Sequence, residues 1–236
     1  MRRRTDLVAY LALRAAIGAM RPLPRGLALR LGTAAGRFTR SPLGLRRAVA
    51  EGNLARAFPD LPQAARDTIC RGVFEHFGRM TVESLRVAAT GGREVLPLVR
   101  AGDVPALVRD LLGRGRGLLV LTGHIGNWEV AAAFMAALGL PVTAVWKPQA
   151  NPWVADYLDS LRRRLAVDAI PMPEARAGGY RAFAEVLDEA PRGNADQLVP
   201  RIATLYRASL EAVVRTAPEQ YLWTHRLWKT PPPAGP

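Results

Sequence analysis

Cysteine and lysine are scarce in this chain of 236 residues. Its single cysteine, Cys70, excludes an intrachain disulfide framework and a cysteine-rich zinc site. Lys147 and Lys229 are the only lysines, so 31 of the 33 Lys and Arg residues are arginines. Against 20 acidic residues they leave a net charge of +13. Such a charge favours an anionic partner: nucleic acid, an acidic protein or a phosphate-bearing lipid.

Internal repeats and low-complexity linkers are also absent, apart from a Pro/Gly-rich tail at residues 231–236. Hydrophobic residues make up 49% of the chain and charged residues 22%, which excludes an intrinsically disordered protein. The length suits one α/β domain with a substantial core and is too short for two domains of common size. We therefore expect one domain followed by a disordered tail.

The N-terminus lacks a hydrophobic run long enough to cross a bilayer. Its apolar stretch, residues 7–20, follows three arginines, is interrupted by Arg14, and falls short of the ~20 residues that a spanning helix needs. No small-x-small cleavage site follows the stretch, as one would after a signal peptide. We expect this segment to lie on a membrane surface or to serve as a single N-terminal anchor.

As a helix, the first 21 residues would carry two stripes, one with the arginines and one apolar. The first stripe contains Arg3, Leu7, Tyr10, Arg14, Ile17 and Arg21, and the second contains Val8, Leu11, Ala12, Ala15 and Ala19. This pattern favours a helix in a membrane interface, with arginines that reach lipid phosphates. The alternative is an amphipathic helix that packs on a soluble core.

The hydrophobic period changes along the chain. Helical patterns cover residues 22–40, the segment from Ser41-Pro42 to Pro59, and residues 61–89. Short apolar runs of strand length follow at 118–122, 142–146 and 167–170, separated by helical patterns at 128–138 and 152–164. This alternation predicts an α/β fold, in which a helical N-terminal region precedes a mostly parallel sheet covered by helices. A last helix is expected over residues 196–216.

The sequence Gly123-His124-Ile125-Gly126-Asn127-Trp128-Glu129 lies where the first expected strand gives way to its helix. Ligands of open parallel sheets bind at the carboxyl ends of the strands. With His124 in the turn and Glu129 in the first helical turn, the carboxylate accepts a hydrogen bond from one imidazole nitrogen, and the other nitrogen takes a proton. This dyad, with no Ser or Cys beside it, suits a base that activates a substrate hydroxyl. The alternative is a packed histidine and a glutamate that only faces the helix dipole.

Two other classes of function are disfavoured by the same sequence. Zinc binding is disfavoured because only His76 and His225 remain as nitrogen donors, and neither stands at ligand spacing from His124. Nucleic-acid binding is disfavoured because the arginines are spread along the chain, without interleaved aromatic residues or a known motif.

The block at residues 123–129 resembles the signature of the lipid A biosynthesis (lauroyl/myristoyl) acyltransferase family. This family belongs to the wider glycerolipid acyltransferase group, which shares a His-x4-Asp/Glu motif. Three further blocks resemble the family in the same order. They are Arg46-Arg47 with Asn53-Leu54 and Phe58-Pro59, then Trp146-Lys147-Pro148 with Asn151-Pro152 and Arg162, and finally residues 218–229.

The resemblance implies an enzyme of lipopolysaccharide synthesis on the cytoplasmic face of the inner membrane. It would move a fatty acyl chain from acyl carrier protein, without a cofactor or metal, to a hydroxyl of a lipid A precursor or related phosphorylated glycolipid. His124 would deprotonate that hydroxyl, and Glu129 would hold the imidazole. Gly126 and Asn127 would orient the motif or stabilise the oxyanion through their amides. Lys147 and Arg162 would bind phosphate, with solvated surface charge as the alternative.

The resemblance also implies a helical membrane-associated region at residues 1–90 and an acyltransferase core at residues 91–230. Part of the positive charge would dock the acidic acyl carrier protein. The aromatic residues after position 220 are expected to pack together rather than to act in catalysis.

One departure from the family concerns the sheet, which we expect to be shortened. Tyr180-Arg181 runs almost directly into residues 183–189, where family members carry further strands. The alternative function is therefore a catalytically impaired, internally deleted family member that only binds membrane.

Overall fold

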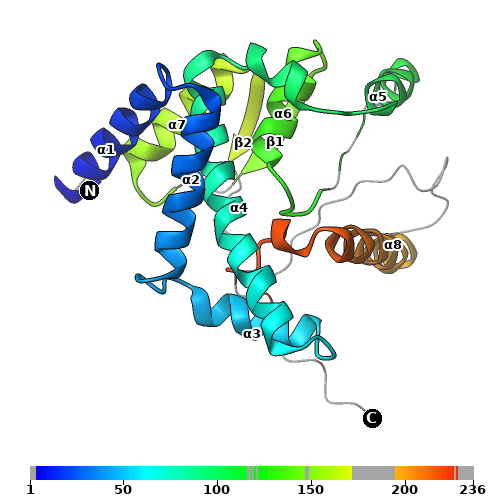
Figure 1. Cartoon of the computed structure of the whole chain (residues 1–236). Coiled ribbons are helices and arrows are strands. Elements are labelled where there is room, and N and C mark those ends of the chain that lie inside the picture. The colour runs from blue at the N-terminus through cyan, green and yellow to red at the C-terminus, as the bar shows by residue number, and fades with distance from the viewer. Residues whose placement is uncertain are drawn as a thin grey trace. The chain divides into compact units, whose positions relative to one another are not determined.

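The structure is a computed structural model that describes residues 4–115, 118, 120, 122–146, 149–171, 195–225 and 227 (Figure 1). This part of the chain is mostly helical, with a two-stranded parallel sheet. The chain divides into two compact units. The first contains residues 1–23, 83–123 and 127–210, and the second contains residues 24–82, 124–126 and 211–236. The predicted division into 1–90, 91–230 and 231–236 stays a prediction.

The sheet of the first unit consists of β1 (Val142–Trp146) and β2 (Val167–Pro171), joined through α7 (Pro152–Arg164). The strands are parallel, with Val142 opposite Val167 and Trp146 opposite Pro171. A parallel pair needs a crossover connection, and the helical segment between the strands supplies it. The strand–helix–strand order predicted between residues 142 and 170 is thus confirmed.

The core of the first unit forms around α6 (Trp128–Ala137), which contacts both strands and the short 3-10 helix η1 (Arg93–Leu98). The helix is apolar on nearly all sides, as expected for a helix surrounded by other elements. Its Ala133 and Phe134 are buried together with Val87 and Val95. After η1, α5 (Val104–Gly113) completes the helices that precede the motif.

The strand predicted at residues 118–122 is not found among the residues described there. Leu118, Val120 and Thr122 lie outside any strand, and Val120 is 69% exposed. Leu119 and Leu121 lie outside the described residues. A short apolar run fits a buried strand and an irregular segment equally well, because its composition carries no information about a partner strand. The mostly parallel sheet is therefore confirmed only as two strands.

The N-terminal helix α1 (Arg4–Met20) packs on α7 through one stripe of its surface. Tyr10 stacks on Trp153 with ring centroids 5.7 Å apart, and Ile17 is buried. Val8 and Leu11 are 66% and 52% exposed. Of the stripe that was predicted to carry cations toward lipid, Ile17 is buried and Tyr10 half-buried, whereas its described arginines, Arg14 and Arg21, are exposed. The predicted apolar stripe is exposed as well.

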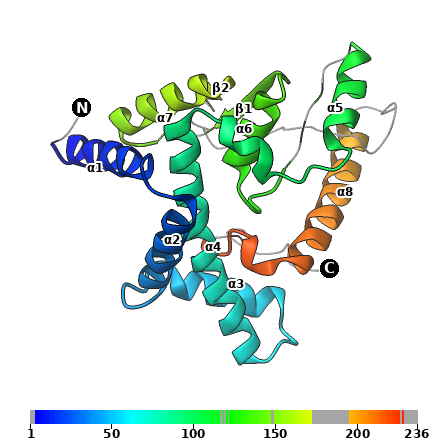
Figure 2. The same cartoon turned by 45° about the horizontal axis from the view of Figure 1, so that its top comes forward.

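In the second unit, α2 (Arg25–Arg40) lies beside α4 (Gln63–Thr90), as Figures 1 and 2 both show. Small residues make this contact: Ala28, Gly32 and Gly36 are the buried residues of α2. A Cβ atom added at Gly78 of α4 would lie 2.9 Å from the backbone nitrogen of Gly36 and closer still to the carbonyl oxygen of Gly32. The two backbones thus approach too closely for larger side chains.

The remaining elements of the second unit are α3 (Arg47–Ala57), the last turns of α8 (Ala195–Thr216) and the 3-10 helix η2 (Pro218–Gln220). Its core contains Leu54, Cys70, Val73 and Phe74. Burial raises the pKa of the Cys70 thiol. The four predicted helices of residues 22–90 and 196–216 are confirmed. The segment in which the family departure was noted, residues 172–194, lies outside the described residues.

Candidate active site

Asn127 ends the turn of the motif and caps α6. Its backbone is extended, and its Oδ1 accepts hydrogen bonds of 3.2 Å from the Val130 amide and from the Ser84 hydroxyl. This cap satisfies one of the free amides at the helix start. Glu129 therefore stands in the first turn of α6, where the helix dipole favours a carboxylate.

Removal of this cap is expected to destabilise the protein. Asn127→Ala should lower the free energy of unfolding by about 1 kcal/mol, because the Val130 amide loses its acceptor. Urea denaturation followed by circular dichroism measures the change. Asn127→Ser restores a capping oxygen and should recover most of the loss, whereas equal loss in both variants would contradict the capping role.

The Glu129 carboxylate is bound by an arginine from the next helix along the chain. Arg162 of α7 donates from Nη2 to Glu129 Oε1 over 2.8 Å. The Arg162 guanidinium also lies over the ring of Trp146 at the end of β1, 4.7 Å from its centroid. The Arg162 side chain is 15% exposed and that of Glu129 36%. Arg162, predicted as a phosphate ligand, is thus placed on the predicted catalytic carboxylate.

Gly123, which precedes His124, contacts α8. A Cβ atom at this position would lie 2.5 Å from Leu210 Cδ1 and 3.6 Å from the Tyr206 hydroxyl. That hydroxyl donates to the Thr122 carbonyl oxygen over 3.4 Å. Burial raises the pKa of the Tyr206 phenol, so it remains a protonated donor at neutral pH. The absent side chain at Gly123 therefore allows α8 to pack against the segment before the motif.

His124 and Gly126 belong to the second unit, where a C-terminal segment pairs with their backbones. The Leu222 amide donates to the His124 carbonyl oxygen, and the Gly126 amide donates to the Gln220 carbonyl oxygen, each over 3.2 Å. Between these bonds, Ile125 and Tyr221 form an antiparallel bridge. Gly126 has a φ of +60°, which a residue without a Cβ atom adopts readily.

The same C-terminal segment carries a packed aromatic cluster. Trp223 is 3% exposed, and its ring meets that of Phe58, the residue after α3, edge-on with centroids 5.7 Å apart and that of Tyr221 at 5.0 Å. Its Nε1 donates to the Pro218 carbonyl oxygen over 2.5 Å. Asn53 of α3 binds the carbonyl oxygens of Trp223 and His225. These contacts give Tyr221 and Trp223 the packing role expected of them, while Trp228 lies outside the described residues.

The predicted site residues fall into three groups. Glu129, Asn127 and Arg162 meet in or beside the first turn of α6, within the first unit. His124 and Gly126 lie in the second unit, and Lys147 lies outside the described residues. The pairing of the His124 and Glu129 side chains stays a prediction. The sequence did not indicate the contact between Arg162 and Glu129, because 33 residues separate them.

The chain matches the model of a protein family, the bacterial lipid A biosynthesis acyltransferases, over residues 3–195. This range includes the motif at residues 123–129, the helices that precede it, and Arg162, which binds Glu129 of the motif. A search of the curated proteins finds no match. Because the family model covers most of the chain, the chain belongs to the bacterial lipid A biosynthesis acyltransferase family.

Proposed function

We propose that this chain is an acyltransferase that moves a fatty acyl group from acyl carrier protein to a hydroxyl of a lipid A precursor or a related phosphorylated glycolipid. The observation that carries the proposal is the match to the family model across the whole His-x4-Glu block. The positive charge of the chain supports both an acidic protein donor and a phosphorylated acceptor. The reaction needs no cofactor beyond the acyl thioester.

In the proposed reaction, His124 is the general base. Its imidazole takes the proton of the acceptor hydroxyl as the oxygen attacks the thioester carbonyl carbon. The tetrahedral intermediate then collapses, the carbon–sulfur bond breaks, and the imidazolium returns the proton to the departing thiolate. Glu129 orients the imidazole and stabilises its charged form.

Arg162 supports this role of Glu129 from α7. An arginine fixed over the Trp146 ring and bound to Glu129 limits the rotamers of the carboxylate, which is the requirement for a group that must orient another. Nη1 of Arg162 is buried and makes no hydrogen bond to another described residue. This donor supports a second role for Arg162, the binding of a substrate oxygen or phosphate.

Gly126 and Asn127 have supporting roles in the proposed mechanism. The Gly126 amide already donates to Gln220, so Gly126 serves the shape of the turn. The Asn127 side chain holds the start of α6 and thereby the position of Glu129. In this proposal, the backbone amide of Asn127 stabilises the oxyanion.

The function is tested with the purified full chain, acyl carrier protein loaded with a labelled fatty acid, and a phosphorylated glucosamine lipid that carries free hydroxyls. We expect a product with one further acyl chain, detected by mass spectrometry. Absence of product over a range of acyl lengths and acceptors, in a folded protein that binds vesicles, would favour the impaired family member that only binds membrane.

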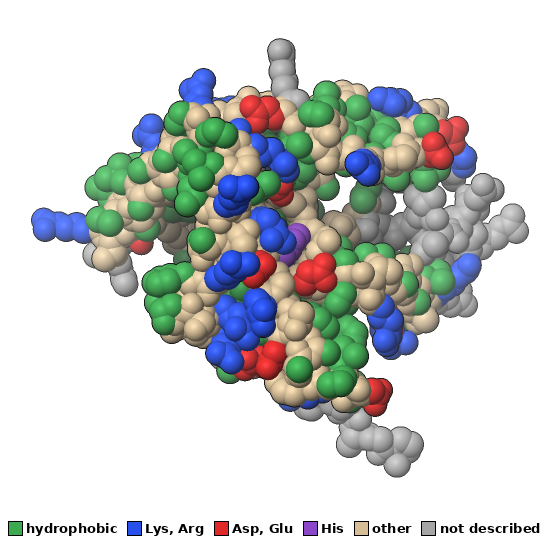
Figure 3. Space-filling view, in the orientation of Figure 1, with side chains coloured by type: hydrophobic (Ala, Val, Ile, Leu, Met, Phe, Trp, Pro, Cys, Tyr) green, Lys and Arg blue, Asp and Glu red, His purple; other side chains and the backbone are tan. Residues whose placement is uncertain are grey.

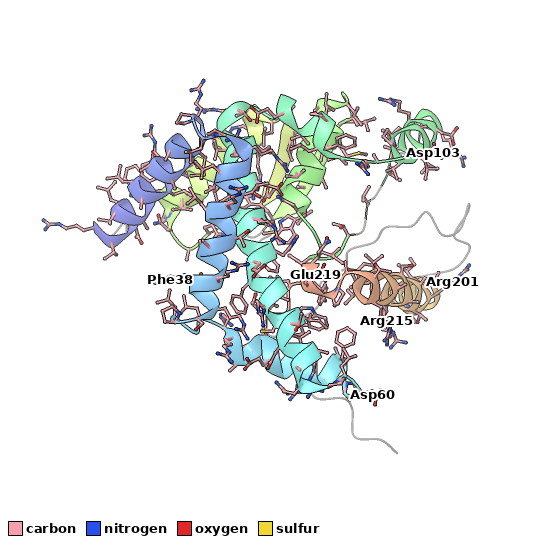
Figure 4. All side chains as sticks on the ribbon, viewed as in Figure 1. Phe38, Asp60, Asp103, Arg201, Arg215 and Glu219 are labelled. Atoms are coloured by element: carbon pink, nitrogen blue, oxygen red, sulfur yellow. The ribbon has the colours of Figure 1, made fainter. Side chains whose placement is uncertain are left out.

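We further propose a peripheral association with the cytoplasmic face of the inner membrane. Residues 7–50 contain eight arginines and no acidic residue. Three large apolar residues of α2 are exposed: Leu27 at 47%, Leu31 at 49% and Phe38 at 56%. Figure 3 shows arginines gathered over α2 and α4, and Figure 4 labels Phe38 near the end of α2. Exposed apolar side chains beside arginines suit an anionic lipid surface.

No helix in the described part of the chain is long and apolar enough to cross a membrane. The exposed apolar stripe of α1, with Val8 and Leu11, is a further candidate for a membrane contact, and Leu11→Asp is its test. We expect about 30-fold weaker binding to vesicles that contain anionic phospholipid, measured by sedimentation, because a buried Leu contributes about 2 kcal/mol to such binding. Val213→Asp, at a 49% exposed valine of α8, is the matched control. Equal binding of both variants would contradict the assignment.

A further inference from the structure

We propose that Asn53 is a positioning residue for His124, although 71 positions separate them in the sequence. It acts through residues 218–225, which we call the C-terminal clasp. The inference rests on the proposed function, in which His124 is the general base. All of the contacts that carry it lie within the second unit.

The first step links α3 to the clasp. Asn53 is 7% exposed, and its Nδ2 donates to the carbonyl oxygens of Trp223 over 2.6 Å and His225 over 2.7 Å. A carboxamide nitrogen has two hydrogens, and both are used here. Because the two acceptors are two positions apart in one turn, a single side chain fixes the shape and the place of that turn.

The second step links the clasp to His124. Leu222, next to Trp223, donates its amide hydrogen to the His124 carbonyl oxygen. The Gly126 amide, two positions after His124, donates to the carbonyl oxygen of Gln220, two positions before Leu222. His124–Gly126 lies in neither a helix nor an extended strand. These two backbone hydrogen bonds, on either side of the Ile125–Tyr221 bridge, therefore hold its backbone in place. A displacement of the clasp is therefore transmitted to the backbone that carries the imidazole.

A third contact holds the clasp from α4. A Cβ atom added at Gly72 would lie 2.8 Å from the Cβ of Glu219, so helix and clasp are in close contact there. Figure 4 labels Glu219 in this region. The buried Trp223 ring, against Phe58, supplies the apolar part of the same attachment. α3 and α4 thus hold both ends of the clasp.

The chemistry of the clasp requires asparagine in particular. An ionised aspartate has the same shape but only accepts hydrogen bonds, so at position 53 it would face two carbonyl oxygens without a donor. Buried acceptors that lose their donor destabilise the arrangement by more than a neutral deletion does. The family match includes Asn53 and His124 but ends before the clasp, so the assignment comes from the contacts alone.

The test observes His124 directly and does not depend on turnover. The chain has three histidines, and the imidazole carbon–proton signal of His124 is identified by its loss in His124→Ala. Two variants perturb the clasp from different sides: Asn53→Asp removes both donors, and Gly72→Ala introduces a methyl group against Glu219. Gly52→Ala is the matched control, since a Cβ atom there meets nothing within 4 Å.

We expect Asn53→Asp and Gly72→Ala to shift or broaden the His124 signal and to change its titration midpoint, while Gly52→Ala does neither. In the acyl transfer assay, we expect kcat to fall about tenfold or more in both clasp variants with KM within about twofold, because a small displacement of a catalytic group affects mainly the chemical step. If Asn53→Asp does not fold, Gly72→Ala decides the question.

A wild-type His124 signal and titration in a folded clasp variant would overturn the inference. Absence of turnover in the wild-type protein would overturn the proposed function and leave the spectroscopic test of the clasp unaffected. A shift in the signal without a fall in kcat, in an active enzyme, would also overturn the positioning role.

Discussion

His124→Ala is expected to lower kcat for acyl transfer about 10³-fold. The variant removes the only group proposed to take the proton of the acceptor hydroxyl, and general-base catalysis contributes about 10²–10⁴-fold to such reactions. The measurement is transfer of a labelled acyl group from acyl carrier protein to the phosphorylated glycolipid under saturating substrate. Thermal unfolding of the variant, compared with wild type, verifies that the protein remains folded.

Companion variants separate the roles within the proposed dyad. Glu129→Gln keeps the shape of the side chain but removes its charge, so we expect a smaller loss in kcat of about 10²-fold. Its contact with Arg162 also weakens, because a charge-assisted hydrogen bond becomes a neutral one. His76→Gln, on α4, is the control for the loss of an imidazole elsewhere. Full activity in His124→Ala would remove the dyad from the mechanism.

Gly78→Val is expected to cause the largest loss of stability in the chain, about 3 kcal/mol or more. A Cβ atom at Gly78 meets backbone atoms of Gly32 and Gly36, which cannot rotate away as a side chain does. The helices α2 and α4 must then separate, which exceeds the usual cost of an overpacked core. Chemical denaturation monitored by tryptophan fluorescence measures the difference.

The control for this substitution is Gly26→Ala on α2, the helix against which α4 packs. A Cβ atom at Gly26 meets nothing within 4 Å, so the free energy of unfolding should stay constant or rise by up to about 1 kcal/mol. If Gly78→Val unfolds at the same denaturant concentration as Gly26→Ala, the close contact between α2 and α4 does not exist in solution.

Local patterns in the sequence predicted those parts of the fold that depend on local physics. The helices of residues 22–90 follow from hydrophobic spacing and from the proline and glycine residues that end helices, and the structure contains them. The parallel pair β1–β2 follows from two short apolar runs around a helical pattern. The first predicted strand is not found among the described residues, because strand formation depends on a partner that a single run does not specify.

The motif was recognisable, but its surroundings were not. Asn127 and Glu129 fell where the turn and the helix start were expected, since capping is a local property. The contact of Arg162 with Glu129 and that of Asn53 with Trp223 join positions far apart in the chain. Arginine clusters and buried amides leave no spacing signal, so only coordinates reveal these partners. The composition of the small residues around Gly32 on α2 predicts a helix of low intrinsic stability. It does not indicate that these residues form a contact surface.

The division of the chain has a consequence for biosynthesis. Residues 124–126 belong to the second compact unit, whose other residues are synthesised either well before or well after them. When the ribosome has completed α6 and the sheet, the backbone partners Gln220 and Leu222 of the motif have not yet been synthesised. A nascent chain interrupted after residue 216 would contain the motif at residues 123–129 but lack the backbone partners of His124 and Gly126, so premature termination there should yield a chain that keeps the His-x4-Glu motif without the hydrogen bonds that hold its backbone.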